Sequence, residues 1–217
     1  MAISSRTRNQ GFTLIELMLA MVFLSAIILF GVLTFVQALA VYNKGISISQ
    51  INETGRALTN DLNRSSNNAT SFMVSDQIMC IGKTAYMWNT VATPTGQQYR
   101  VSGQPIGIVR TVDSIDARNT YCNSASRTIQ PNDVTSLIGT QVRVLDVTVG
   151  QPDSAAAEGS SLEAPLLKFV LTIGTRSEDG AVDPVQSGTY WTCPTGTFGT
   201  FCAVGTYSTT IYVQSGS

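Results

Sequence analysis

The longest apolar segment of the chain runs from Phe12 to Val41 and contains one charged residue, Glu16. It has about 30 residues, whereas an α-helix needs only about 20 apolar residues to cross a bilayer. Within a bilayer every backbone polar group must be paired inside the segment, so a single spanning segment is helical. Arg6 and Arg8 precede it, and this positive charge favours a cytoplasmic N-terminus. The sequence therefore predicts a membrane-spanning helix, but insertion alone does not explain a costly carboxylate near its start.

Other targeting segments fit this stretch less well. The apolar core of an ordinary secretory signal has about 7–15 residues, roughly half the length found here. Ala38–Ala40 has the A-x-A form of a cleavage site, and cleavage there would leave a mature chain that starts at Val41. A lipoprotein signal needs a cysteine at the cleavage point, and the first cysteine is Cys80. A plain uncleaved anchor remains open, but none of these readings explains Glu16.

The helical pattern continues beyond the apolar segment. A stripe of apolar residues and one glycine follows at helical spacing: Ile48, Ile51, Gly55, Leu58 and Leu62. Polar and charged residues occupy the other faces, and the first proline of the chain is Pro94. We therefore expect one helix from Phe12 to about Arg64, on the order of 80 Å long, with an apolar first half and an amphipathic second half.

The composition excludes several kinds of active site. Charged residues make up 12% of the 217 residues, against about 25% in average soluble proteins. The 13 Lys and Arg nearly balance the 14 Asp and Glu, which gives no electrostatic footprint for nucleic acid. The chain has no histidine, so Ser-His and Cys-His catalysis are excluded. No Gly-rich phosphate loop is present either. We expect no enzyme, no cofactor and no metal site.

All the cysteines follow the apolar segment: Cys80, Cys122, Cys193 and Cys202. If that segment crosses a membrane outward, they face an oxidising compartment, where disulfides persist. Three pairings are possible, and the short turn-rich loop between Cys193 and Cys202 favours Cys193–Cys202 together with Cys80–Cys122. Buried free thiols are the alternative. A zinc site is disfavoured because no pair has C-x-x-C spacing.

Past about Ser71 the pattern changes to short β-prone runs divided by Gly, Pro, Asn and Ser. Strands are predicted at Phe72–Cys80, Ala85–Val91, Gly107–Val112, Gln141–Val149, Leu166–Thr175 and Tyr207–Val213. Residues 150–165 form a loop of small residues, and Asp133–Gly139 is a candidate helical turn. The amphipathic half of the helix can cover one face of such a sheet.

The residues GFTLIEL, from Gly11 to Leu17, resemble the type III signal of the type IV pilin and pseudopilin superfamily. In that family a short basic leader ends in Gly, the mature chain starts with Phe, and Glu stands at the fifth mature position. Here these residues are Gly11, Phe12 and Glu16. The resemblance implies that a membrane-embedded prepilin peptidase cuts between Gly11 and Phe12, and that Phe12 is N-methylated. It covers about the first 65 residues closely and the rest in outline.

The resemblance also implies a role for Glu16. Cleavage would create a positive α-amine on Phe12, which Glu16 can compensate within its own helix. In the family's usual account the carboxylate pairs with the Phe amine of a neighbouring subunit and so sets the axial register. A carboxylate that merely snorkels to the interface is the alternative. Many interchangeable apolar residues would pack between helices, among them Ala20, Val22, Phe23 and Ile27.

One departure from the family's pattern lies in the middle of the apolar segment. Many pilins have a proline there, which allows the helix to melt locally in the fibre, whereas this chain has Gly31 and no proline. Glycine weakens a helix much less than proline does. The missing proline therefore bears on whether the helix melts locally during assembly. It does not bear on whether the subunit assembles.

The rest of the chain resembles the globular head of pilins, with a long N-terminal helix packed on an antiparallel sheet. The resemblance implies an α+β, pilin-like fold, and the long insertion and late strand look more like the larger minor pilins of the W or J type. We expect a leader at residues 1–11, a transmembrane and assembly helix at 12–42, an amphipathic continuation at 43–65 and a β-rich head at 66–217.

Three clusters in the head are weaker candidates. Glu178, Asp179 and Asp183 are oxygen-rich enough for calcium, but their spacing fits no EF-hand and a solvated turn is favoured. Asp113 and Asp116 lie near Arg110 and Arg118, which favours loop ion pairs or caps over acid–base catalysis. The third cluster surrounds the last two cysteines and has aromatic residues that could touch a sugar, DNA or a neighbouring subunit: Tyr190, Trp191, Phe198, Phe201 and Tyr207. For this cluster we favour a loop that is fastened to the sheet over a binding surface.

The function that the resemblance implies is a structural subunit, of the minor class, in a type IV pilus or pilus-like filament. Its partners would be the prepilin peptidase, other pilin subunits, the lipid bilayer and an inner-membrane assembly platform with its ATPase. It would span the inner membrane before assembly and afterwards lie in an extracellular or periplasmic filament. The alternatives are a type II secretion pseudopilin, a competence pilin, or a single-pass membrane protein with an external binding domain that never polymerises.

Overall fold

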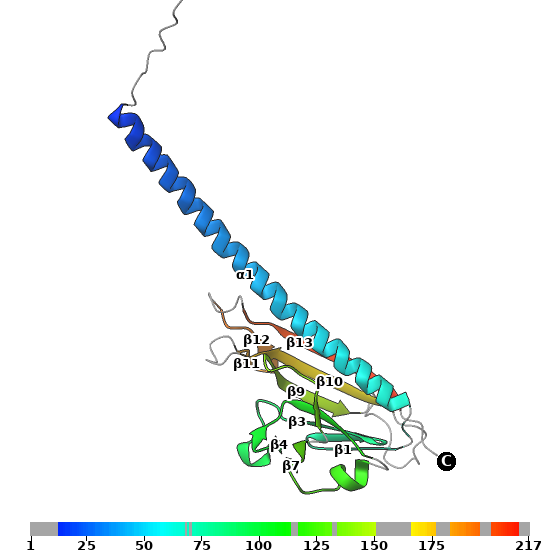
Figure 1. The fold of residues 1–217 in the computed structure, drawn as a ribbon. Coiled ribbons are helices and arrows are strands. Elements are labelled where there is room, and N and C mark those ends of the chain that lie inside the picture. The colour runs from blue at the N-terminus through cyan, green and yellow to red at the C-terminus, as the bar shows by residue number, and fades with distance from the viewer. Residues whose placement is uncertain are drawn as a thin grey trace, which may run out of the picture. The chain divides into compact units, whose positions relative to one another are not determined.

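The computed structural model describes residues 13–67, 69, 71–113, 117–131, 134–150, 166–176, 183–195 and 201–212, without the side chains of residues 118 and 119. The chain divides into two compact units, Met1–Tyr42 and Asn43–Ser217. One helix, α1 (Leu14–Asn67), belongs to both units, and the described strands all lie in the second (Figure 1). The α+β layout expected from the sequence is confirmed.

The first unit contains the apolar part of α1. The helix has 54 residues, and its most apolar window has a mean hydropathy of 2.7 and no buried residue. By length and composition, α1 is the one helix of the described chain that can cross a membrane. It begins at Leu14 and extends to Asn67, a little beyond the expected end at Arg64. The expected first residue, Phe12, lies outside the described residues.

In the second unit, α1 buries one stripe of residues: Ile51, Gly55, Leu58, Leu62 and Ser66. This is the stripe that the helical spacing predicts, except at Ile48, whose side chain is 43% exposed. The expectation that Ile48 shares the packing face is therefore wrong. The strand that covers the helix reaches Ile51 through Gly205, so Ile48 lies about one helical turn before the covered part.

Two antiparallel sheets build most of the second unit. The larger has the order β1-β2-β3-β6-β8, and its strands are Phe72–Ser75, Ile78–Ile81, Thr84–Trp88, Ile108–Val112 and Val134–Ser136. The other has the order β13-β10-β9, with β9 at Val142–Gly150, β10 at Leu166–Thr175 and β13 at Val204–Tyr212. Figure 1 shows the cyan half of α1 lying along β10 and β13.

Smaller elements complete the second unit. One small sheet has the order β5-β4-β7, from Gln104–Pro105, Arg100–Val101 and Thr128–Ile129, and a hairpin joins β11 (Val185–Ser187) to β12 (Tyr190–Thr192). There are also a 3-10 turn, η1, at Thr95–Gln97 and a π-helical turn, η2, at Arg118–Cys122. None of these short elements is predicted from the sequence, because two to five residues carry no recognisable period.

Most of the predicted strands are confirmed in position. β10 has exactly the predicted bounds, while β3, β6 and β9 differ by one residue at their start and by up to three at their end. β13 begins at Val204 rather than Tyr207. The single strand predicted at Phe72–Cys80 is wrong, because this segment is the hairpin β1–β2. Asp76 turns the chain there with a positive φ of 29°.

The helical turn predicted at Asp133–Gly139 is also wrong. Residues Val134–Ser136 form strand β8, and Asp133 itself lies outside the described residues. β8 pairs with β6, and the amide of Leu137 continues the ladder by donating to the carbonyl of Ile108 at 3.0 Å. Pairing with a distant strand therefore overrides the local preference of this segment.

The core lies between α1 and the inner faces of both sheets. Its largest members include Trp88 from β3 and Phe169 from β10, whose rings meet edge to face at 6.2 Å. A second, smaller cluster forms on the other face of the larger sheet, around Cys80 and Cys122. The amphipathic half of α1 is thus an integral part of the head's core.

Candidate functional site

The start of α1 is closed by a reciprocal capping arrangement between Thr13 and Glu16. One carboxylate oxygen of Glu16, Oε2, accepts from the backbone amide of Thr13 at 3.0 Å and from its hydroxyl at 2.9 Å. The amide of Glu16 donates back to the Thr13 hydroxyl at 3.4 Å. This is a capping box, which pairs amides that the first turn of a helix leaves free. Thr13-x-x-Glu16 is its sequence signature, and the sequence analysis missed it.

The apolar part of α1 presents side chains on all sides. Of the packing candidates, Val22 is 67%, Phe23 61% and Ile27 67% exposed, and Ala20 is also exposed. Among the described residues, nothing would lie within 4 Å of a Cβ atom added at Gly31. This segment therefore has no cover from the described chain, and it needs either lipid or other helices around it.

Two hydroxyl groups in this segment are hydrogen-bonded within the helix. The hydroxyl of Ser25 donates to the carbonyl of Val22 at 2.9 Å. The hydroxyl of Thr34 donates to the carbonyls of Phe30 and Gly31 at 3.1 and 2.9 Å. Such back-bonding removes the cost of placing a hydroxyl in an apolar environment.

The amphipathic half of α1 is joined to the larger sheet by a cluster of polar groups. Arg110 on β6 forms an ion pair with Asp61 on α1, with 2.5 Å between Nη1 and Oδ1. The hydroxyl of Tyr86 on β3 donates to the other Asp61 oxygen at 2.8 Å and lies 2.7 Å from the hydroxyl of Ser65. Burial raises the pKa of the Tyr86 hydroxyl well above its usual range, the nearby Asp61 carboxylate adds to this rise, and the Ser65 hydrogen bond opposes it.

Arg110 was considered with Asp113 and Asp116 as part of a loop ion-pair cluster. The structure gives Arg110 a partner on the helix, Asp61, which is 49 positions away in the chain. No local signal in the sequence connects these residues. Asp116 lies outside the described residues, and so does the side chain of Arg118.

The β13-β10-β9 sheet approaches α1 closely at Gly55. A Cβ atom at this position would overlap the ring of Tyr207 on β13, so glycine is required for the approach. The Tyr207 hydroxyl donates to the side-chain carbonyl of Asn52 at 2.8 Å, and the Thr209 hydroxyl donates to that of Asn63 at 3.1 Å. Tyr207, grouped with the aromatic loop in the sequence analysis, is therefore part of the helix–sheet contact.

Both favoured disulfides are present in the structure. Cys80 and Cys122 are joined with 6.2 Å between their Cα atoms, and Cys193 and Cys202 with 5.6 Å. No cysteine of the chain is free, which rules out the alternative of buried thiols. The second bridge follows β12 directly and holds the segment before β13.

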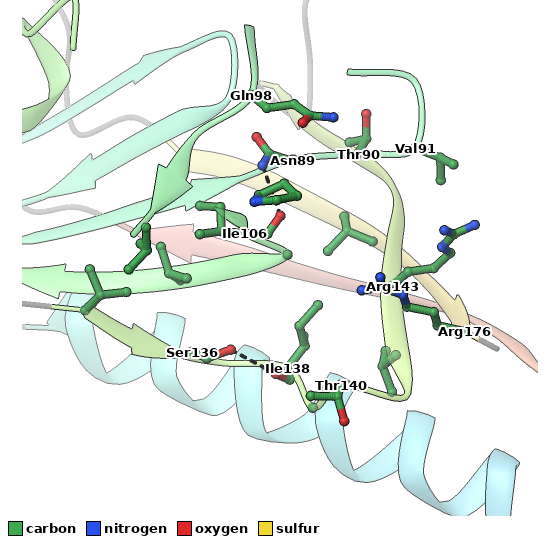
Figure 2. A pocket seen from close by; sticks show the side chains of 18 of the residues that line it. Asn89, Thr90, Val91, Gln98, Ile106, Ser136, Ile138, Thr140, Arg143 and Arg176 are labelled. Atoms are coloured by element: carbon green, nitrogen blue, oxygen red, sulfur yellow. Dashed lines mark hydrogen bonds between the residues drawn. The ribbon is translucent and has the colours of Figure 1, made fainter. Parts of the chain in front are cut away.

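A groove of about 580 Å³ lies beside β9, between the chain around Asn89 and the arginines Arg143 and Arg176 (Figure 2). The side chain of Asn89 is fully engaged, because its amide donates to the carbonyls of Tyr99 and Ile106 at 2.8 and 3.0 Å and its carbonyl accepts from the Tyr99 amide. Arg143 pairs with Asp183 at 2.7 Å. The described lining contains no carboxylate, cysteine, lysine or histidine, so it supplies no general base.

The calcium candidate is only partly visible. Glu178 and Asp179 lie outside the described residues, and Asp183 forms its ion pair with Arg143. In the part of the chain that the structure describes, no group of three or more possible metal ligands occurs.

The fold separates Tyr207 from the other aromatic candidates that the structure describes. Tyr190 on β12 is 75% exposed and Phe201 beside the second disulfide is 40% exposed. Trp191 is half-buried, and Phe198 lies outside the described residues. The expectation of one aromatic cluster is wrong at Tyr207, which packs against α1 because it lies on the inner face of β13.

Comparison with known proteins identifies one segment. A family model described as the prokaryotic N-terminal methylation motif matches residues 6–34. These residues include the two arginines before the apolar segment, the capping box at the start of α1 and most of the apolar segment. No curated protein and no solved structure matches the chain.

Proposed function

The chain carries the prepilin-type signal of the type IV pilin and pseudopilin superfamily, and from this premise we propose that it is a structural filament subunit. It is made as a membrane-anchored precursor, cut after Gly11 by a prepilin peptidase and N-methylated on Phe12. It is then packed helix to helix into a type IV pilus or a pilus-like filament. The resemblance of the head, in outline, to the larger minor pilins favours a minor subunit of the W or J type.

The observation that carries this proposal is the exposed apolar half of α1. An apolar surface of this extent does not persist in water, and a bilayer covers it only while the subunit stays in the membrane. Packing against the same segment of other subunits supplies the second cover that a filament requires. The all-round exposure suits this, because in a bundle each helix has neighbours on several sides.

Glu16 gives the packing its register. After cleavage, Phe12 would carry a positive α-amine two positions before Leu14, the first helical residue. A carboxylate at membrane depth is costly and needs a partner, and the amine of a neighbouring subunit can be that partner at only one axial offset. The capping box survives cleavage, since the amide of Thr13 belongs to the Phe12–Thr13 peptide bond.

The amphipathic half of α1 anchors the head. Because it contributes Ile51, Leu58 and Leu62 to the core and Asp61 to an ion pair, it does not detach from the sheets when the apolar half changes its surroundings. Force along the filament then acts on a helix whose second half is built into the head. Precursor and assembled subunit would carry the same head, first on the outer side of the inner membrane and then in the filament.

The rival machines share this architecture. A type II secretion pseudopilin and a competence pilin would be processed and assembled in the same way, with an inner-membrane platform and its ATPase as partners. A non-polymerising membrane protein would keep Glu16 without needing it for incorporation. A capped helix start suits a filament subunit and a non-polymerising membrane protein equally well. Cleavage and methylation of the N-terminus therefore have to distinguish the two.

The test is the N-terminal sequence and intact mass of the protein recovered from native cells. We expect a chain that begins at Phe12 and carries one N-methyl group, present in sheared filament fractions as well as in membranes. A chain that begins at Met1 would mean an uncleaved anchor, and one that begins at Val41 would mean an ordinary secreted domain. Either result would reject the filament subunit.

A further inference from the structure

The hairpin β11–β12 and the neighbouring disulfide segment carry exposed apolar side chains. Val185 and Tyr190 lie on the same face of the hairpin and are 51% and 75% exposed. Phe201, beside the Cys193–Cys202 bridge, is 40% exposed. Trp191 is half-buried and lies on the other face of the hairpin. We call Val185, Tyr190, Trp191 and Phe201 the aromatic tip.

The aromatic tip is held against the first turns of α1 within the second unit. The hydroxyl of Ser47 donates to the carbonyl of Phe201 at 3.3 Å. The disulfide next to Phe201 joins this segment to Cys193, which directly follows β12. Only four residues separate Ser47 from Tyr42, where the apolar first unit ends. The covalent chain therefore keeps the tip within reach of the surface from which the spanning segment emerges.

The charge pattern around the tip is that of an interface segment. From Pro184 to Ser217 the chain has no Asp, Glu, Lys or Arg, and between Glu16 and Glu53 the only charged residue is Lys44. No carboxylate of these segments would have to be dehydrated or repelled at an anionic membrane surface. Tyrosine and tryptophan concentrate at membrane–water interfaces, and a lysine beside them can reach lipid phosphates.

We propose that the aromatic tip lies in the headgroup region of the bilayer while the subunit is anchored in the membrane. The tip contacts the leaflet on the side of the membrane opposite the leader peptide, and its ligand is the phospholipid headgroup surface. This contact keeps the head against the membrane surface, and it is lost when the subunit is assembled into the filament. This inference rests on the membrane-anchored state in the proposed function.

The test uses the full chain in liposomes, with tryptophan as a depth probe. In a Trp191→Phe background, Tyr190→Trp places the probe in the tip, and Val112→Trp is the matched control. Val112 is 57% exposed and pairs with Thr84 at the end of the larger sheet. That end is near Ala69, which follows α1, because a Cβ atom at Gly82 would touch Ala69 at 3.3 Å. The buried Trp88 stays in every variant as a constant background.

We expect headgroup-proximal brominated lipids to quench the Tyr190→Trp probe by about twofold or more and to leave Val112→Trp unchanged, because only the tip reaches the interface. Aqueous iodide should quench the two probes in the opposite order. Wild-type Trp191, measured in the unmodified chain, gives a second readout if the substituted hairpin misfolds.

The outcomes separate this inference from the proposed function. If the chain fails to float with the liposomes, the anchored state is absent and both fall. If it floats but iodide alone quenches both probes, the lipid contact is overturned and the filament proposal stands. If the tip probe loses its iodide quenching only in assembled filaments, the tip contacts a neighbouring subunit, and the lipid proposal is overturned as well.

Discussion

Glu16 accepts both a backbone and a side-chain hydrogen bond from Thr13, so the carboxylate that begins the apolar segment is already partnered inside its own helix. Only one of its oxygens is used in these bonds. The second oxygen remains available for a charge that arrives later. Capping and charge pairing are therefore two separable roles of one side chain.

Glu16→Gln separates these roles, because glutamine can still accept the Thr13 bonds but has no charge. We expect Glu16→Gln and Glu16→Leu to insert in the membrane and to be cleaved, and both to be lost from sheared filaments. Glu16→Leu should also fray the first turn, at about 0.5–2 kcal/mol for a lost cap.

The measurement is immunoblotting of sheared and membrane fractions, with Thr13→Ser as the control that keeps the capping hydroxyl. Normal filament incorporation of Glu16→Gln alongside failure of Glu16→Leu would mean that the cap, and not the charge, is what assembly requires.

Gly55→Ala tests the close approach of α1 to β13. Alanine favours a helix by about 1 kcal/mol over glycine, yet here its Cβ atom would overlap the ring of Tyr207. We expect a net loss of about 1–3 kcal/mol in the free energy of unfolding, as for other overpacked cores. Chemical denaturation of the full chain in detergent, followed by the fluorescence of the buried Trp88, measures this loss.

Gly45→Ala is the control for this change, because no described atom lies within 4 Å of an added Cβ atom there. It should be neutral or stabilising. A stabilising Gly55→Ala would show that the Tyr207 ring moves aside at little cost.

The buried hydroxyl of Tyr86 predicts a loss of stability at high pH. Because burial raises its pKa in the folded state, the folded chain holds this proton more tightly than the unfolded chain does. The stabilisation is complete below the unfolded pKa of about 10 and falls above it, by up to about 1.4 kcal/mol per pH unit for one group.

The check compares the unfolding free energies of wild type and Tyr86→Phe between pH 8 and about pH 11, where the phenol begins to titrate. Tyr86→Phe should be less stable at neutral pH, by about 1–2 kcal/mol for the lost hydrogen bonds, and should have a shallower alkaline slope. Tyr207, whose pKa burial also raises, remains in both proteins. Equal slopes would contradict the prediction.

The two disulfides should contribute unequally to stability. Cys80–Cys122 closes a span of 42 positions and Cys193–Cys202 a span of 9. Loop entropy predicts about 4 kcal/mol for the first bridge and about 2.7 kcal/mol for the second. Cys80 is also fully buried in the smaller core cluster, so its removal leaves a cavity as well.

We therefore expect Cys80→Ala/Cys122→Ala to lower the melting temperature more than Cys193→Ala/Cys202→Ala does, measured by circular dichroism on the full chain in detergent. Pairwise replacement avoids leaving a reactive thiol. A larger effect of the second pair would mean that the aromatic tip, and not the smaller core, limits the stability of the head.

The sequence alone determined the parts of this protein whose interactions are local. Helix α1 follows from an uninterrupted apolar run, because a helix pairs its backbone groups within four residues and its buried stripe repeats with the helical period. Strand β10 follows from its own run of apolar residues. The capping box was equally readable, since Thr13 and Glu16 are three positions apart.

Only the tertiary structure decided the features that join distant parts of the chain. Val134–Ser136 is a strand because β6 offers it a ladder, and Arg110 pairs with Asp61 across 49 positions. Tyr207 turned out to belong to the helix–sheet contact because the register of β13 places its ring over Gly55. Such contacts depend on which surfaces the folded chain brings together, and no period or spacing in the sequence encodes them.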